Sequence, residues 1–170
     1  MLNPKIEKAL NDQINHEMHS AYNYLAMAAY CEHVNLAGFS QWMLHQRQEE
    51  LAHAMRLYKY LLDRGGMLDL ASVKKPRTDY KTIAELFESA LESEKANTAA
   101  INNLYSLAID LKDYATQSAL QWFIDEQVEE EKLMSDVLAL VKLGGDDKSA
   151  LLVLNRQLGE RRGEGAGATP

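Results

Sequence analysis

Acidic residues that interrupt apolar helical stripes constrain this chain more than any other feature of its sequence. Glu17 lies within one such stripe, and Glu50 follows 33 residues later, with His53 one helical turn beyond it. Residues three or four apart share one face of a helix. Adding 77 to these positions gives a second set with the same spacing, namely Glu94, Gln127 and Glu130. Two helical hairpins related by an approximate twofold axis would bring both sets to one central point.

These groups predict a bound metal ion. A carboxylate among apolar side chains is costly unless a positive charge compensates it. The alternative is a helical bundle whose core acids are held in salt bridges. It is disfavoured because the set contains four acids and no Lys or Arg, and clustered carboxylates repel one another. Glutamate and histidine suit a first-row transition metal. The predicted ligands are Glu17, Glu50, His53, Glu94 and Glu130, with Glu50 central enough to bridge two ions.

Further polar residues flank this set, and each allows two interpretations. Three acids that would share Glu130 form either a neighbouring, weaker metal site or a solvated acidic face: Glu49, Glu126 and Glu129. Gln127 carries no charge and could hydrogen-bond a bound water or dioxygen. Tyr24 lies two turns from Glu17 on the same face, where it either orients a ligand or donates an electron, or simply packs with a satisfied hydroxyl.

The apolar periodicity predicts an all-α fold, a four-helix bundle spanning about 4–143. The expected helices are 4–33, 39–64, 82–111 and 113–143, followed by a short fifth helix at 148–159. Start signals support them: Asn3 before Pro4, Thr82 with Glu85 three residues on, and Asp113. Residues 66–81 form one long connection, which we expect to cross the length of the bundle and make the second and third helices parallel. Residues 35–38 are expected to form a short turn, and 161–170 a flexible tail.

Composition excludes some functions. Hydrophobic residues make up 46% of the chain, enough for a substantial core, and the net charge of −7 argues against a nucleic-acid partner. Cys31 is the only cysteine, so a reducing compartment is expected. The N-terminal residues have no apolar signal core, and no apolar run reaches membrane-spanning length. We therefore expect one cytoplasmic domain that does not interact with a membrane.

The chain resembles the ferritin family, and most closely the bacterial non-haem ferritins, over about residues 1–160. The resemblance rests on the pattern of Glu17, Tyr24, Glu49-Glu50-x-x-His53, Glu94 and Glu126-Gln127-x-Glu129-Glu130. It implies a ferritin-like bundle with a fifth helix, in a homo-oligomeric hollow shell of 24 subunits. It also implies that Fe(II) is oxidised by dioxygen or hydrogen peroxide at a di-iron ferroxidase centre, and that the Fe(III) is stored as a mineral inside the shell.

The resemblance also implies roles for individual residues. Glu17, Glu50 and His53 would hold the first iron; Glu50, Glu94 and Glu130 the second; and Glu49, Glu126, Glu129 and Glu130 a third. Haem-containing bacterioferritins carry a His where this chain has Glu130, so no haem is expected. Animal members line their threefold pores with acids, where this chain reads Gln117, Ser118, Leu120 and Gln121. An acidic iron channel is therefore not expected there.

Two alternatives stay open from the sequence. A di-iron peroxidase or oxygenase of the rubrerythrin type would use similar ligands, although this chain lacks the Cys-x-x-Cys pairs of a rubredoxin module. A helical binding module without metal is the non-enzymatic alternative.

Overall fold

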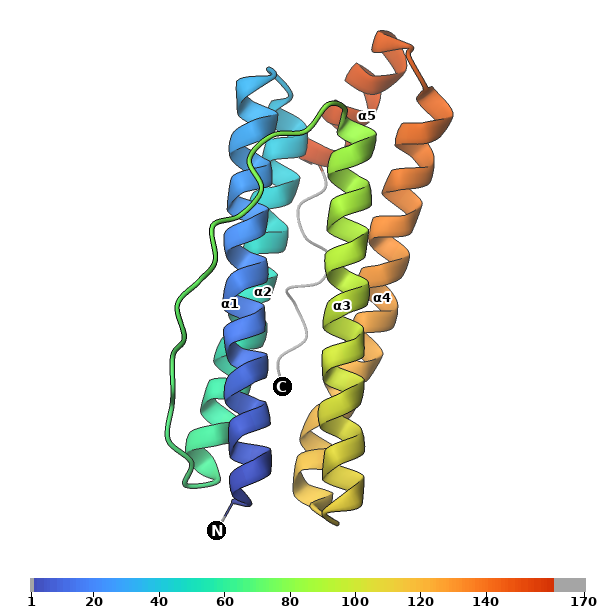
Figure 1. The fold of residues 1–170 in the computed structure, drawn as a ribbon. Helices are drawn as coiled ribbons and strands as arrows, with labels where there is room; N and C mark the ends of the chain where they lie inside the picture. Colours follow the sequence, from blue (N-terminus) through green and yellow to red (C-terminus); the bar gives the residue numbers. More distant parts are fainter. Residues whose placement is uncertain (1, 161–170) are drawn as a thin grey trace.

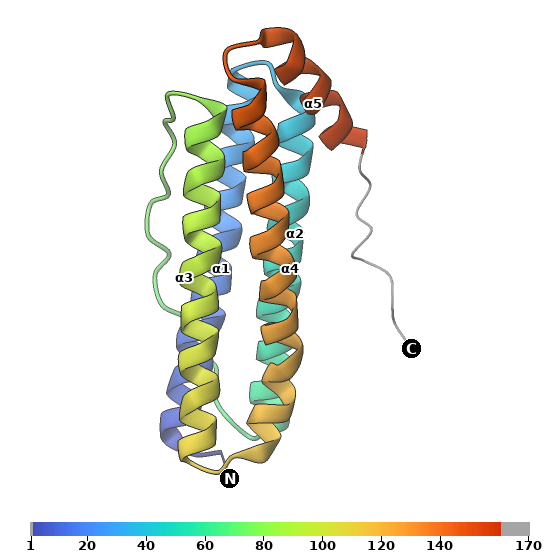
Figure 2. The same ribbon diagram turned by 90° about the vertical axis from the view of Figure 1, so that its right-hand side faces the viewer.

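The computed structural model describes residues 2–160, which form five α-helices (Figure 1). They are α1 (Pro4–His33), α2 (Ala37–Asp63), α3 (Ile83–Asp110), α4 (Tyr114–Gly144) and α5 (Lys148–Glu160). The first four form an elongated bundle, and α5 lies at one end of it, where it packs against α2 and α4 (Figure 2). This confirms the predicted all-α architecture. The predicted tail at 161–170 lies outside the described residues.

Side-chain caps begin three of the helices as the sequence predicts. The Asn3 side chain accepts a hydrogen bond from the amide of Lys5 at the start of α1. Thr82 accepts from the amide of Glu85 at 3.1 Å at the start of α3. Asp113 accepts from the amide of Thr116 at 3.1 Å at the start of α4. Each cap satisfies a backbone donor that the first turn of a helix leaves free.

The long connection between α2 and α3 follows the outside of α1 along the bundle (Figure 1). Two asparagines of α1 hold it through paired side-chain to backbone hydrogen bonds. Asn11 bonds the carbonyl of Met67 and the amide of Asp69, at 2.9 and 2.8 Å. Asn15 bonds the carbonyl of Asp69 and the amide of Ala71, both at 2.9 Å. These bonds let a segment without regular structure cross the bundle, as predicted, because they replace the pairing that a helix would provide.

The turn between α1 and α2 is shorter than predicted. Asn35 adopts a left-handed conformation with φ of 60°, which asparagine tolerates. Helix α2 then begins at Ala37, so Gly38 lies inside the helix and not in the predicted turn. Gly38 is required there because a Cβ atom would lie 1.8 Å from the carbonyl oxygen of Asn155. The absence of a side chain lets α5 approach the backbone of α2.

Helix α5 packs two of its leucines against its own subunit. Leu154 and Leu158 are 8% and 2% exposed and belong to the apolar cluster at that end of the bundle. The Asn155 side chain also accepts a hydrogen bond from the amide of Phe39 at 3.0 Å. Only the opposite face of α5, with Leu152 and Val153 at 57% exposure each, is left uncovered. Helix α5 is therefore anchored to its own bundle.

Two apolar clusters fill the bundle and leave a polar layer between them. One, at the α5 end, contains Phe39, Phe87 and Met134. The other, at the opposite end, contains Leu10 and Leu57. Each of the four long helices contributes buried polar residues to the layer between the clusters. None of the helices in the described part of the chain has the length and apolar character that crossing a membrane requires.

Candidate metal centre

The five predicted ligands converge in the polar layer and are almost completely buried. Their exposed fractions are 0% for Glu17 and Glu50, 1% for Glu94, and 4% for His53 and Glu130. They come from all four long helices, one from each of α1, α3 and α4 and two from α2. The twofold arrangement expected from the 77-residue repeat therefore brings side chains from distant parts of the chain together.

Two groups of side chains lie close enough to share an ion. Glu17, Glu50 and His53 each offer a ligand atom, and these atoms lie within 4.8 Å of one another. The same holds for His53, Glu126 and Glu130. The first group is the set expected for the first iron. The second links His53 to two acids of α4, a combination that the sequence did not suggest.

Glu50 is the least compensated member of the layer. Within the described residues, neither of its carboxylate oxygens has a hydrogen-bond partner, and the same is true of His53 Nδ1. His53 Nδ1 lies 3.9 Å from Glu50 Oε1, beyond hydrogen-bonding distance. Buried polar atoms without partners are costly. Carboxylate oxygens and an imidazole nitrogen that lie this close together have the chemistry of a metal-binding set.

Burial and mutual repulsion raise the pKa values of the acids. Burial, opposed by hydrogen bonds and assisted by the charge of Glu94, raises the pKa of Glu17 to about 7. Burial and then the charges of Glu17 and Glu94 raise the pKa of Glu50 well above its usual range. Burial and the same neighbouring Glu94 raise the pKa of Glu130 to about 9. Without a cation, the layer holds protons at neutral pH, and a bound cation would displace them.

His53 is held in an aromatic environment that favours its neutral form. Its ring makes edge contacts with Trp122 and Phe123, at centroid distances of 5.3 and 6.1 Å. Arg56 lies over the Trp122 ring, 4.1 Å from its centroid. Burial and then the charge of Arg56 lower the pKa of His53 to about 4. The neutral imidazole keeps the lone pair that binding to a metal requires.

A network of buried amides surrounds the acids, and sequence analysis missed two of its members. Gln13 donates to Glu17 at 2.7 Å and to Asn97 at 2.6 Å. Asn97 donates to Glu17 at 3.2 Å and to Gln127 at 3.5 Å. Gln127 in turn donates to Glu94 Oε2 at 3.4 Å. The sequence did contain a signal for Gln13 and Asn97, since each lies one helical turn from an acid on the same helix face.

Tyr24 and Gln46 complete the contacts of the other acids. The buried Tyr24 hydroxyl donates a hydrogen bond to Glu94, so its side chain orients a predicted ligand. Gln46 donates to Glu130 at 3.1 Å. Glu94 and Glu130 therefore have fixed positions before any ion binds.

The acids of the predicted third site are less buried than the paired ligands. Glu49 and Glu126 are half-buried, whereas Glu129 is exposed. His45 Nδ1 lies 3.7 Å from Glu49 Oε2. Burial and then the charges of Glu129 and Glu49 raise the pKa of Glu126. The charges of Glu49 and Glu129 thus act on Glu126, and of the three acids only Glu126 belongs to one of the two compact ligand groups.

A four-helix bundle with carboxylate and imidazole donors from all four helices belongs to the class of helical proteins whose core can hold metal ions. Residues 7–143 match the ferritin-like domain family. The bacterial non-haem ferritin of Staphylococcus aureus strain USA300 is 40% identical over 161 residues, which cover 95% of this chain and 97% of that protein.

Solved structures agree with the sequence comparison. An open-pore ferritin from the archaeon Archaeoglobus fulgidus is similar with a TM-score of 0.94 and 42% identity, over 95% of this chain and 100% of that one. A form of the A. fulgidus ferritin engineered to be closed is similar with a TM-score of 0.94 and 41% identity, over 95% and 99% of the two chains. The chain therefore belongs to the ferritin family. These matches do not favour the rubrerythrin-type alternative.

Proposed function

We propose that this chain stores iron and is a ferroxidase. It oxidises Fe(II) to Fe(III) at a paired centre inside each subunit, with dioxygen or hydrogen peroxide, and keeps the ferric mineral inside a hollow cage. Membership in the ferritin family and similarity to bacterial non-haem ferritins support iron storage. The observation that carries the proposed chemistry is the fully buried Glu50 carboxylate, which has no hydrogen-bond partner within residues 2–160 and lies close to Glu17 and His53.

The proposed roles are those that the resemblance to ferritins implies, and the burial of the five paired-site ligands supports them. Glu17, Glu50 and His53 bind one Fe(II), and Glu50 is shared with a second Fe(II) at Glu94 and Glu130. Tyr24 and Gln127 orient Glu94 through the hydrogen bonds described above. Glu49, Glu126 and Glu129 bind a third iron together with Glu130. No haem takes part.

The reaction needs two electrons, which explains why two ions are paired. Two Fe(II) ions each give one electron to dioxygen, which takes up two protons and becomes hydrogen peroxide. Carboxylates stabilise Fe(III) more than Fe(II) because the product ion carries the higher charge. Glu17, Glu50 and Glu130, with pKa values raised in the iron-free protein, release protons when the ions bind.

The proposed setting is a cytoplasmic homo-oligomer built from one ferritin-like domain, residues 1–160. Twenty-four copies of a 19.2 kDa chain give about 460 kDa.

Three measurements on the purified, iron-free protein test the proposal. Anaerobic titration should find two tight Fe(II) sites per subunit, and stopped-flow mixing with dioxygen should give a fast oxidation phase at that loading. Light scattering should find a particle of cage size. A stable monomer or dimer at physiological salt would contradict the storage cage, and a chain that binds no Fe(II) would favour a binding module without metal.

A further inference from the structure

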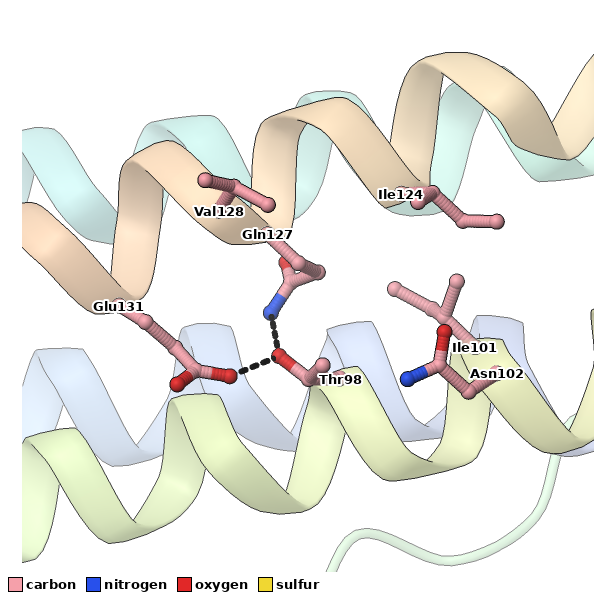
Figure 3. Close-up of a pocket in the computed structure, with 7 residues that line it drawn as sticks. All are labelled: Thr98, Ile101, Asn102, Ile124, Gln127, Val128 and Glu131. Atoms are coloured by element: carbon pink, nitrogen blue, oxygen red, sulfur yellow. Dashed lines mark hydrogen bonds between the residues drawn. The ribbon is translucent and has the colours of Figure 1, made fainter.

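A cavity of about 270 Å³ lies between α3 and α4, beside the metal centre and outside its ligand set (Figure 3). It is lined by Thr98, Ile101, Asn102, Ile124, Gln127, Val128 and Glu131. Val128 is 68% exposed and Asn102 is exposed, so the cavity opens to the surface of the subunit. A cavity of about 150 Å³ is already large enough to bind benzene, so this one has room for a molecule of two to several heavy atoms.

The side-chain amide of Gln127 forms the inner wall of the cavity and separates it from the metal centre. Gln127 is 2% exposed, and its amide nitrogen lies 3.2 Å from Thr98 Oγ1 and 3.4 Å from Glu94 Oε2. The same nitrogen lies 3.3 Å from the backbone carbonyl of Glu94. A molecule at Gln127 is therefore separated from the predicted ligand Glu94 by this one amide, whose hydrogen bonds of 3.2 to 3.4 Å must give way for the molecule to pass.

A row of hydrogen-bonding groups runs from the mouth to this wall. The Thr98 hydroxyl donates to Glu131 Oε1 at 2.6 Å and accepts from Gln127, so one hydroxyl joins a half-buried carboxylate to the buried amide (Figure 3). The rest of the wall consists of hydrocarbon from Ile101, Ile124 and Val128 and of the Asn102 side chain near the mouth. The cavity thus combines apolar walls with donors and acceptors.

This lining favours an uncharged molecule over Fe(II). Removing water from a divalent ion beside hydrocarbon walls is costly, and Glu131 is the one charged side chain among the lining residues. The acids that suit Fe(II) lie elsewhere, since Glu126 and Glu130 group with His53 across α2 and α4. The two sides of α4 therefore offer separate approaches for a cation and for a neutral molecule.

We propose that the cavity between α3 and α4 binds hydrogen peroxide and delivers it to the metal centre. Peroxide is small and uncharged, and it both donates and accepts hydrogen bonds, which matches the row at Thr98, whereas dioxygen does not use such a row. At the centre, peroxide takes one electron from each of two Fe(II) ions and two protons, its O–O bond breaks, and two water molecules form. The inference rests on the proposed ferroxidase function.

Thr98→Val tests the row of hydrogen-bonding groups, because valine keeps the shape of threonine and lacks the hydroxyl that joins Glu131 to Gln127. Gln127 retains both acceptors on Glu94, and Glu131 is partly exposed and can bond water. We expect the rate of Fe(II) oxidation by peroxide to fall about tenfold, the factor that one hydrogen bond gives. Thr98→Ser should restore it. Oxidation by dioxygen and anaerobic binding of Fe(II) should stay within about twofold of the parent, a factor worth less than one hydrogen bond.

Val128→Phe tests the mouth, with Val128→Ala as the matched control that leaves it open. The larger side chain should slow oxidation by peroxide and leave the Fe(II) binding stoichiometry unchanged. Unchanged peroxide rates in Thr98→Val, with a fast phase present in the parent, overturn the cavity proposal alone. Equal losses with both oxidants, or weaker Fe(II) binding, overturn it as well, because Thr98 would then act on the iron ligands. A parent with no fast phase for either oxidant overturns the ferroxidase function itself.

Discussion

Replacing Glu50 by glutamine should stabilise the iron-free protein at pH 8 while abolishing its fast oxidation of iron. Glu50 is fully buried and its oxygens have no partner within the described residues. Burial, with the charges of Glu17 and Glu94, raises its pKa well above the ordinary value of 4.5. Glutamine has almost the same shape and stays neutral at every pH.

The direction in which stability changes with pH follows from the proton that Glu50 takes up on folding. Because the pKa of Glu50 is higher in the folded chain, the stability of the folded state is greatest below pH 4.5 and falls as the pH rises toward the folded value. Each pH unit in that range costs about 1.4 kcal/mol. As the pH rises from 5 to 8, the parent therefore loses stability through this group, and the variant does not lose it.

The stability of the Glu50→Gln variant relative to the parent also includes a cost from the new glutamine side chain. An amide without a buried partner costs about 1–3 kcal/mol at any pH. The variant should therefore be slightly less stable than the parent at pH 5 and more stable at pH 8. For a chain of this size, each 1 kcal/mol of stability shifts Tm by about 2–4 °C.

Calorimetry of chelator-treated parent and Glu50→Gln at both pH values measures this difference. Glu92→Gln, an exposed position on α3, is the matched control and should follow the parent. In the same preparations, stopped-flow oxidation at two Fe(II) per subunit should lose its fast phase only in Glu50→Gln. If the two Tm values differ by the same amount at pH 5 and pH 8, Glu50 is not held protonated and the reasoning is wrong.

Three further predictions concern the third site and the ends of the bundle. Glu49→Ala and Glu129→Ala should keep fast oxidation but change the Fe(II) to dioxygen ratio or later turnovers in an oxygen-electrode assay; parent-like behaviour of both at every iron loading would make these acids a solvated face. Leu158→Ala should cost about 2–5 kcal/mol in denaturant unfolding; a cost under about 1 kcal/mol would mean that α5 is not docked as described. Asp113→Ala removes the cap of α4 and the ion pair with Arg64, in which the two side chains lie 3.0 Å apart. The variant should therefore be less stable by about 1–3 kcal/mol. A Tm equal to that of the parent would refute this.

The sequence alone determined the helices and which residues share a face. Apolar residues at helical spacing and caps such as Thr82 are local signals, because they depend on neighbours one turn away. Glu50 and His53 could therefore be assigned to one helix face from their spacing. The 77-residue repeat then indicated that Glu17 and Glu94 meet at the centre, since two similar hairpins pack symmetrically.

Only the tertiary structure decided which side chains from different helices touch. Asn97 looks like any polar helical residue until α1 brings Gln13 and Glu17 against it. Gly38 reads as a turn residue until α5 places the carbonyl of Asn155 where its Cβ would be.

The cavity beside the metal centre was likewise decided only by the tertiary structure. Thr98 and Glu131 are 33 residues apart, and their hydrogen bond and the cavity next to it exist only because α3 and α4 pack at this spacing. Helical periodicity sets the direction of a side chain within its own helix. The rotation and separation of neighbouring helices depend on the sum of all their contacts, so the cavity and the amide network cannot be read from either helix by itself.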